Sequence, residues 1–303
     1  MRVCAYLIVR NEAVLLPYAL KSIESVCDEI FVVDNGSTDG TPEIAKATSD
    51  KVRLLYVPGK NGGGFADPDT PEDMLRNIGL NACKGGGADV ILRWDADEIL
   101  YEGQEERIRT LIEERSYGGW WFCCHRFVGS LDWVQDLRWG EPGCSELHKT
   151  IAVDRWGRQA LHGKIVLLRN HPRLKYLRNS HYIGLHSSEY ETAEPHQYRI
   201  CNDIWYAHLE WARSNKRLYD KAILYYNLIA DPNDYARSWE FQSQIDPEHT
   251  LKEQRLRPFH SELPEAMKGL VLPVDLKTEE FWDERSKMAR RRIVKRTWKG
   301  GDW

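Results

Sequence analysis

The stretch "RWDADEIL", residues 93–100, places Asp95 and Asp97 one residue apart, directly after an apolar run. If residues 89–94 form a strand that continues through the motif, both carboxylates point to the same face and can share one cation. Two negative charges at this separation would repel each other without such a cation. The motif therefore predicts a cation site, and an acidic strand end that caps the next helix is the structural alternative.

The first hundred residues alternate between strand-like and helix-like segments. Apolar runs predict strands over residues 2–9, 29–34, 51–57 and 89–94. Helical spacing and cap signals predict helices over residues 11–26, from residue 41 onward, and over residues 71–83, with Pro17 expected to kink the first. This order predicts an α/β fold, a Rossmann-like, mainly parallel sheet flanked by helices.

Polar segments follow each predicted strand, at residues 10–12, 34–40, 59–69 and 95–98. Ligands of parallel sheets bind beyond the carboxyl ends of the strands, so we expect these four segments to converge on one crevice. Asp34 stands where an acceptor can receive hydrogen bonds from a nucleobase or a ribose. A turn that caps the following helix is the structural alternative for this segment.

After residue 103 the sequence no longer shows the regular alternation of strand-like and helix-like segments. Residues 103–115 are expected to form a surface helix, residues 119–128 and 147–156 strands, and the Tyr-, Trp- and Leu-rich part beyond Leu185 two or three packed helices. We divide the chain into a main domain (residues 1–190), a C-terminal helical extension (191–284) and a basic tail (285–303). The main domain has a nucleotide-binding half (1–100) and an acceptor half (101–190).

Composition narrows the class of protein. The chain has 303 residues, a net charge of −4 and seven scattered cysteines without a C-x-x-C pair, which indicates neither a disulfide framework nor a zinc site. No run approaches the roughly 18 apolar residues of a membrane span, and the first residues lack the layout of a signal peptide. We expect a cytoplasmic protein. Its basic tail is a disordered end, or contacts an anionic membrane surface peripherally, or contacts nucleic acid.

Two long segments carry a resemblance to a known family. "AYLIVRNEAVLLPYALKSIESVCDEIFVVDNGSTDGTPEIAK" (5–46) and "LRNIGLNACKGGGADVILRWDADE" (75–98) resemble the family 2 glycosyltransferases of the GT-A fold, and the lipopolysaccharide-core type enzymes in particular. The resemblance implies that the nucleotide of a nucleoside-diphosphate sugar donor lies against a set of residues at the strand ends: Arg10, Asn11, Asp34, Asn35, Arg76 and Asp95.

Two departures from the family pattern affect the nucleotide. Arg10 replaces the usual Tyr, and Asn35 replaces the usual second Asp. Because an Asn side chain both donates and accepts hydrogen bonds, the choice among UDP, GDP, CDP and dTDP stays open.

The resemblance also implies a metal-dependent, inverting sugar transfer. Mn²⁺ or Mg²⁺ would be held by Asp95, Asp97 and a late histidine, for which His186 is the first candidate, ahead of His181 and His162. An acceptor hydroxyl would attack the anomeric carbon while a carboxylate takes its proton, with Glu146 as first candidate and Glu189 and Asp136 behind it. The His-Glu pair of the lipopolysaccharide-type relatives is replaced by His162-Gly163-Lys164.

The acceptor stays open. The aromatic residues of 117–145 suit an acceptor wall or plain core packing. A lipid-linked or lipopolysaccharide sugar, a protein, a small molecule and a hydroxymethylated base in DNA are all compatible acceptors. The alternatives to a glycosyltransferase are a sugar nucleotidyltransferase, whose Gly-x-Gly-x-Arg signature does not follow the first predicted strand, and a noncatalytic GT-A-like protein that binds nucleic acid or an anionic partner.

Overall fold

The computed structural model describes residues 1–58, 70–128, 130–135, 162–172, 174–176, 198–212, 256–259, 261–270, 274–283 and 288–298. The chain divides into two compact units, which we describe one at a time. The first unit comprises Met1–Cys123, Gly163–Tyr206 and Pro264–Met267, and the second comprises Cys124–His162, Ala207–Leu263 and Lys268–Trp303. The units are thus interleaved along the sequence, and the predicted three-part division of the chain stays a prediction.

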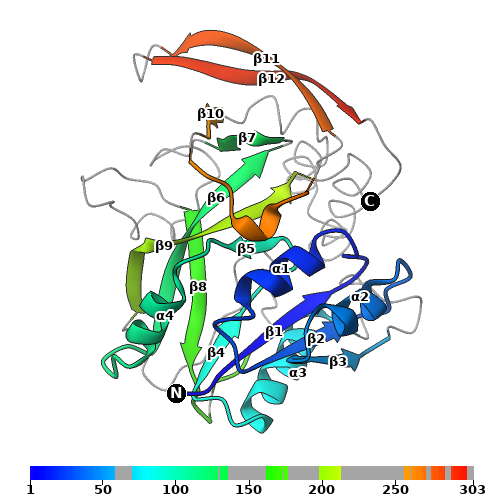
Figure 1. The fold of residues 1–303 in the computed structure, drawn as a ribbon, viewed down its shortest axis with the longest axis vertical. Helices are drawn as coiled ribbons and strands as arrows, with labels where there is room; N and C mark the ends of the chain where they lie inside the picture. The colour runs from blue at the N-terminus through cyan, green and yellow to red at the C-terminus, as the bar shows by residue number, and fades with distance from the viewer. Residues whose placement is uncertain are drawn as a thin grey trace, which may run out of the picture. The chain divides into compact units, whose positions relative to one another are not determined.

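Four parallel strands form the centre of the first unit (Figure 1). β1 (Val3–Val9) pairs with β2 (Glu29–Asp34) on one side and with β4 (Val90–Arg93) on the other, and β2 pairs with β3 (Val52–Tyr56). Every residue of β1 is buried, as expected for a central strand that is covered on both faces. The order β3-β2-β1-β4 confirms the predicted α/β fold, and the strands of the first hundred residues that pair in this order are parallel. The prediction of a mainly parallel sheet is wrong for the sheet as a whole, because the later strands pair antiparallel.

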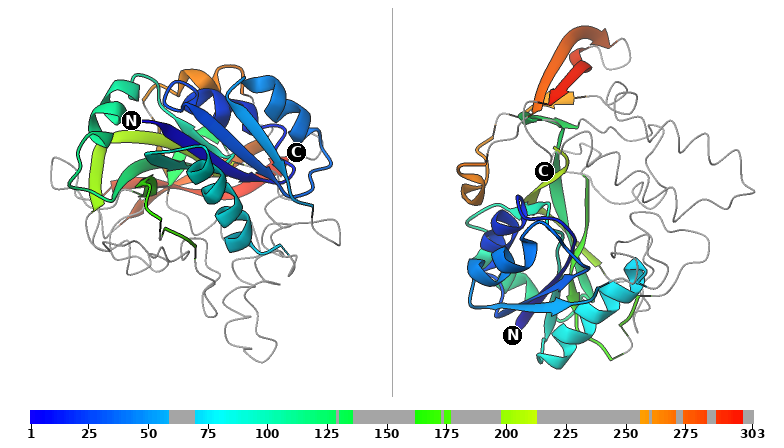
Figure 2. Two further views of the ribbon diagram at one scale, coloured as in Figure 1. Left: turned by 90° about the horizontal axis from the view of Figure 1, so that it is seen from below. Right: turned by 90° about the vertical axis from the view of Figure 1, so that its right-hand side faces the viewer.

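Helices cover both faces of this sheet (Figure 2). α1 (Leu16–Ile23) and α2 (Thr41–Thr48) lie on one face, and α3 (Glu72–Gly85) lies on the other. A fourth helix, α4 (Glu105–Ile112), falls within the range predicted for a surface helix. The predicted kink at Pro17 is wrong, because α1 begins at the residue before it and Pro is well suited to the first helical turn.

α3 is fixed to the sheet through Tyr6 of β1, whose side chain is fully buried. The Tyr6 ring packs edge-on against the ring of Tyr176, with centroids 6.4 Å apart, and the two hydroxyl groups are hydrogen-bonded. Asn77 of α3 binds the backbone of Tyr176 in both directions, accepting at 2.8 Å and donating at 2.9 Å. Gly79 leaves the space in which the Tyr6 ring lies.

Antiparallel strands extend the sheet of the first unit beyond β4. β8 (His162–Arg169) pairs with β4, and β6 (Gly119–Val128) is the next strand in order. β9 (Tyr198–Trp211) pairs with β6 and with the short β5 (Glu98–Leu100). β6 occupies the range that its apolar run predicts, whereas the strand predicted over residues 147–156 lies outside the described residues.

The helices predicted beyond Leu185 are wrong where the structure describes this part of the chain. Residues 198–211 form β9, and only the short 3-10 turn η2 (Glu265–Met267) is helical among the described residues of the predicted extension. Tyr, Trp and Ile favour strands as much as apolar helix faces, and pairing with distant strands decides between the two. The backbone of Trp205, for example, is hydrogen-bonded to Gln104 and Tyr101.

The second unit contains an antiparallel arrangement of strands. β7 (Ser130–Gln135) pairs with β10 (Leu256–Pro258), which pairs with β12 (Met288–Trp298), and β12 pairs along its length with β11 (Val274–Asp283). The expectation of a disordered basic tail is therefore wrong for residues 288–298. In the backbone register of the two strands, Glu279 stands opposite Arg292 and Glu280 opposite Arg291, while Lys277 stands opposite Lys295.

The cysteines and the search for a membrane-spanning helix can be compared with the sequence expectations within the described residues. Six of the seven cysteines lie in the described part, and all six are free and buried. No helix within the described ranges is both long and apolar enough to span a bilayer.

The fit between α3 and β1 gives a test of the fold. A Cβ atom added to Gly79 would lie 2.5 Å from Cδ2 of Tyr6 and 2.9 Å from its Cβ. Since the Tyr6 ring is fully buried, we expect Gly79→Ala to lower the free energy of unfolding by about 1–3 kcal/mol, as overpacking does.

Gly85→Ala, at the end of the same helix, is the matched control for this experiment. A Cβ atom there would meet nothing within 4 Å, so stability should stay the same or rise by up to about 1 kcal/mol. Urea unfolding monitored by circular dichroism measures both changes. Equal stability of the two variants would contradict the packing described here.

Candidate functional site

The loops that follow β1 and β2 are bound to each other. The backbone N–H of Asn11 donates to Oγ of Ser37 at 2.9 Å, and the backbone N–H of Thr38 donates to Oδ1 of Asn11 at 2.7 Å. Asn11 has a φ of 53°, a left-handed conformation that Asn tolerates better than most residues. The predicted convergence of these two polar segments is therefore confirmed, and Arg10 lies half-buried beside them.

Asp34 and Asn35 lie at the carboxyl end of β2, and both are fully buried. Oδ2 of Asp34 accepts a hydrogen bond from the backbone N–H of Ser37 at 3.2 Å, while its Oδ1 has no hydrogen-bond partner within the described part of the chain. The side-chain amide of Asn35 donates to the carbonyl of Val57 at 2.9 Å and to Oγ1 of Thr70 at 3.3 Å. A buried carboxylate oxygen without a donor is costly, so Asp34 is prepared to accept a hydrogen bond from a ligand.

The two aspartates of the opening motif lie in a turn between β4 and β5. β4 ends at Arg93, so the premise that a strand carries Asp95 and Asp97 on one face is wrong. The turn is held by the indole N–H of Trp94, which donates to the carbonyl of Glu98 at 2.7 Å, and by the Glu98 carboxylate, which accepts from the Asp95 backbone N–H at 3.1 Å. Asp97 is buried, and the side chain of Asp95 keeps about a quarter of its surface exposed.

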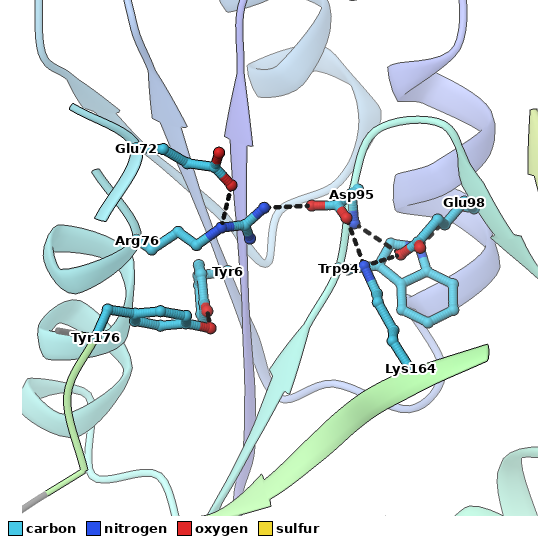
Figure 3. Close-up of polar contacts among 8 residues, drawn as sticks. All are labelled: Tyr6, Glu72, Arg76, Trp94, Asp95, Glu98, Lys164 and Tyr176. Carbon is cyan, nitrogen blue, oxygen red and sulfur yellow. Dashed lines mark hydrogen bonds and ion pairs between the residues drawn. The ribbon is translucent and has the colours of Figure 1, made fainter. Parts of the chain in front are cut away.

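Lys164 of β8 reaches this turn. Its Nζ lies 2.5 Å from Oδ2 of Asp95 and 2.7 Å from Oε2 of Glu98 (Figure 3). The position follows from strand register: β4 and β8 pair Val90 with Arg169 and Leu92 with Leu167, and the same register continued places Lys164 opposite Asp95. Sequence analysis missed this residue, because only the pairing of two strands far apart in the chain brings it to the motif.

Arg76 of α3 approaches the same carboxylate from another side. Its Nη2 lies 3.5 Å from Oδ1 of Asp95, and its Nε donates to Oε1 of Glu72 at 2.7 Å (Figure 3). Nη1 of Arg76 is buried and has no hydrogen-bond partner among the residues that the structure describes. Each oxygen of Asp95 therefore faces a different cation, and the Arg76 guanidinium keeps a donor that a ligand anion can use.

The local charges shift the pKa values of the two contacting carboxyl groups in opposite directions. Burial by itself would raise the pKa of Asp95, but the positive charges around it, that of Lys164 first, hold it well below its usual range. Burial raises the pKa of Glu98 to about 8, and the negative charges of Asp95 and Asp97 add to the rise while Lys164 opposes it. Asp95 is therefore the charged partner of Lys164 at neutral pH.

The described carboxylates do not fit a divalent cation in this arrangement. Oxygen ligands of the kind that Mg²⁺ and Mn²⁺ prefer are present in Asp95 and Asp97. Within the described ranges, however, no three His, Cys, Asp or Glu side chains gather closely enough to hold a metal ion. Both oxygens of Asp95 already face positively charged groups.

Several predicted site residues lie outside the described residues, namely Glu146, Glu189, His186, Asp136 and His181. Their roles as proton acceptor or metal ligand stay predictions. His162 belongs to β8, and its side chain is not described. The structure thus brings together Asp34, Asn35 and Asn11 at one part of the strand edge, and Arg76, Asp95 and Lys164 at another.

Comparisons with known proteins identify the class of this domain. Residues 4–138 match the family described as glycosyl transferase family 2. An uncharacterised glycosyltransferase of Rickettsia typhi is 39% identical over 115 residues, which are 37% of this chain and 33% of that protein. A TPR repeat-containing protein of Synechococcus elongatus is 36% identical over 110 residues, 36% of this chain and 23% of that protein.

Two of the solved structures that match this chain contain a bound nucleotide. One is S. aureus TarS 1–349 in complex with UDP-GlcNAc, with a TM-score of 0.43 and 14% identity over 84% of this chain and 73% of that chain. The other is glucosyl-3-phosphoglycerate synthase from Mycobacterium tuberculosis in complex with Mn²⁺, UDP and glucosyl-3-phosphoglycerate, with a TM-score of 0.30 and 19% identity over 42% of this chain and 45% of that chain.

Residues 4–138 therefore form a family 2 glycosyltransferase domain, as the sequence predicts. The chain spans a quarter to a third of the length of the curated relatives named above. The similarity to lipopolysaccharide-core type enzymes stays a prediction.

The raised pKa of Glu98 gives a pH-dependence test of the site. Between its ordinary pKa of 4.5 and about 8, the folded protein keeps a proton on Glu98 that the unfolded chain has released. The folded state binds more protons there, so Glu98 makes the free energy of unfolding fall as pH rises through this window. We expect Glu98→Gln to remove this fall, by at least about 1 kcal/mol between pH 5 and pH 8.

Urea unfolding at pH 5, 6, 7 and 8 in the presence of EDTA measures this difference. Glu43→Gln, an exposed position on α2, is the control and should follow the wild-type pH dependence. Parallel curves for wild type and Glu98→Gln would show that Glu98 is ionised in the folded protein throughout this range.

Proposed function

We propose that this protein is a glycosyltransferase that moves a sugar from a nucleoside-diphosphate sugar to an acceptor hydroxyl. The proposal is supported by the family 2 domain in residues 4–138 and by the polar residues at the carboxyl ends of the parallel strands. TarS and glucosyl-3-phosphoglycerate synthase are described with UDP or a UDP-sugar, and we extend the nucleotide-sugar donor to this chain. Among the described residues, no feature favours the noncatalytic alternative.

The observation that carries the proposal is a pair of buried polar atoms that lack partners. Oδ1 of Asp34 is an acceptor suited to an N–H of a base or a hydroxyl of a ribose, and Nη1 of Arg76 is a donor suited to a phosphate oxygen. Other buried nitrogens of the described residues, such as Nε1 of Trp120, also lack a hydrogen-bond partner, and we single out these two atoms because of their chemistry and their place near the strand ends. One unpaired acceptor and one unpaired cationic donor match the two ends of a nucleoside diphosphate.

In the proposed reaction, the acceptor hydroxyl attacks the anomeric carbon from the side opposite the diphosphate. A bond forms between the hydroxyl oxygen and the anomeric carbon, the bond from that carbon to the phosphate oxygen breaks, and its electron pair stays on the phosphate. The proton of the hydroxyl passes to a carboxylate, for which Glu146 and Glu189 stay the predicted candidates. Arg76 would stabilise the charge that grows on the departing diphosphate.

Metal dependence stays a prediction, and no step above depends on it. The sequence predicts Mn²⁺ or Mg²⁺ at Asp95, Asp97 and His186, but the oxygens of Asp95 face Lys164 and Arg76, and His186 lies outside the described residues. The acceptor, which we predict to be a lipid-linked or lipopolysaccharide sugar, and a cytoplasmic or peripheral location also stay predictions. Contact of the basic segment, residues 285–303, with an anionic membrane surface or with nucleic acid also stays a prediction.

Asp34→Asn tests the nucleotide site. The Asn oxygen can still accept from the backbone N–H of Ser37, while its NH₂ group places a donor where Oδ1 now offers an acceptor. We expect the turn to persist and the affinity for the donor to fall by about tenfold or more, the effect of losing a hydrogen bond to a charged group.

A thermal-shift panel of UDP, GDP, CDP and dTDP sugars identifies the donor for this comparison, since a ligand that binds the native state raises the melting temperature. Asp50→Asn, an exposed position before β3, is the control. If no nucleotide sugar stabilises the wild-type protein with or without Mn²⁺, the proposed function is wrong. If one binds wild type and Asp34→Asn equally, the role of Asp34 is wrong.

The stereochemistry of transfer gives a second test. We expect the product to carry the sugar with the anomeric configuration opposite to that of the donor, because the acceptor enters opposite the leaving diphosphate. Proton NMR of the anomeric signal during turnover measures it. A product with the configuration of the donor would require a second displacement and would contradict the single-step reaction.

A further inference from the structure

Lys164 stands where a cation is expected from the chemistry of the motif. Its Nζ lies within 2.7 Å of two carboxylate oxygens, Oδ2 of Asp95 and Oε2 of Glu98. A bridging divalent ion would make the same kind of contact, with carboxylate oxygens on one side and phosphate oxygens on the other. The side chain of Lys164 is 11% exposed, and its ammonium group lies against these two carboxylates.

The position of Lys164 is built into the fold. It belongs to β8, whose antiparallel register with β4 brings it opposite Asp95. Its neighbour Gly163 packs so tightly that a Cβ atom there would lie 2.0 Å from the backbone oxygen of Phe122. The strand cannot shift freely at this point, so the ammonium group is held beside the turn rather than placed there by a long, mobile side chain.

Lys164 and Arg76 together carry the charge of a divalent cation. They face the two different oxygens of Asp95, at 2.5 Å and 3.5 Å. Lys164 uses two of its three N–H donors within the described structure, and Nη1 of Arg76 has no acceptor. Each cation therefore keeps a donor for a phosphate oxygen while its other donors bind carboxylate.

We propose that Lys164 replaces the divalent cation at this motif, so that Lys164 and Arg76, anchored by Asp95, bind the diphosphate of the donor without a metal ion. This inference rests on the proposed function for the identity of its ligand. In the reaction, the two side chains stabilise the negative charge on the diphosphate as its bond to the sugar breaks, and neither gives up a proton. A metal ion would have to displace Lys164 to reach Asp95.

Metal binding in the absence of nucleotide tests the first half of the proposal. Mn²⁺ titrated into the protein is followed by electron paramagnetic resonance, which detects the free ion. We expect weak binding to wild type and binding about tenfold tighter or more to Lys164→Met, which removes the ammonium group from Oδ2 of Asp95 and Oε2 of Glu98. Lys46→Met, an exposed position on α2, should behave as wild type. Tight binding of Mn²⁺ to wild type that Lys164→Met does not improve would overturn the proposal.

Donor binding tests the second half. The donor that the thermal-shift panel identifies is titrated calorimetrically into wild type, Lys164→Met and Lys46→Met, in EDTA and in Mn²⁺. We expect wild type and Lys46→Met to bind equally in both solutions, and Lys164→Met to lose affinity by about tenfold or more in EDTA. Binding to wild type that requires Mn²⁺ would overturn the proposal and leave the glycosyltransferase function intact.

The experiments stay decisive if Lys164→Met does not fold or if no nucleotide sugar binds. If Lys164→Met does not fold, as judged by circular dichroism, Lys164→Gln keeps two donors without the charge, and the wild-type comparison of EDTA with Mn²⁺ decides the question without any variant. If no nucleotide sugar binds in either solution, the proposed function fails. In that case the Mn²⁺ titration alone decides whether Lys164 holds the position of the cation.

Discussion

The arrangement of the site depends on the contact between the Asp95 carboxylate and the Lys164 ammonium. Asp95 carries a negative charge at the end of β4, next to the buried carboxyl groups of Asp97 and Glu98. Without a cation, the charge of Asp95 would be poorly compensated in a poorly solvated turn. Lys164 contributes that cation from a strand about 70 residues further along the chain. Burial by itself would raise the pKa of Asp95; this contact is the first of the charge interactions that lower it, and Arg76 adds to the effect.

Local sequence signals are sufficient for the parallel half of the first unit. β1, β2 and β4 are short, nearly continuous apolar runs, and the helices between them show apolar residues at helical spacing. The turn after β2, with its Asp, Asn and Gly residues, marks the strand end that holds Asp34. The family resemblance added the expected roles, and the domain it names is confirmed for residues 4–138.

Signals that depend on distant pairing are not visible in the sequence alone. Residues 198–211 contain aromatic and branched side chains that suit a helix face or a strand, and hydrogen bonds to Gln104 and Tyr101 accompany the strand. Residues 288–298 look like a charged tail in the sequence, because the strand that pairs with them, β11, cannot be recognised from local signals. The role of Lys164 was hidden for the same reason. The premise that Asp95 and Asp97 lie on a strand failed because β4 ends two residues before the first of them.

Because β8 pairs with β4, the residues matched by the family model do not contain the whole sheet around the site. The match to the family ends at residue 138, before β8 begins. A fragment truncated there would retain the aspartate motif and Arg76, and would lack the strand that neutralises Asp95. The charged cluster of the site is therefore discontinuous in the chain. An amino-terminal segment carries its carboxyl groups, and a later strand carries the ammonium group that faces them.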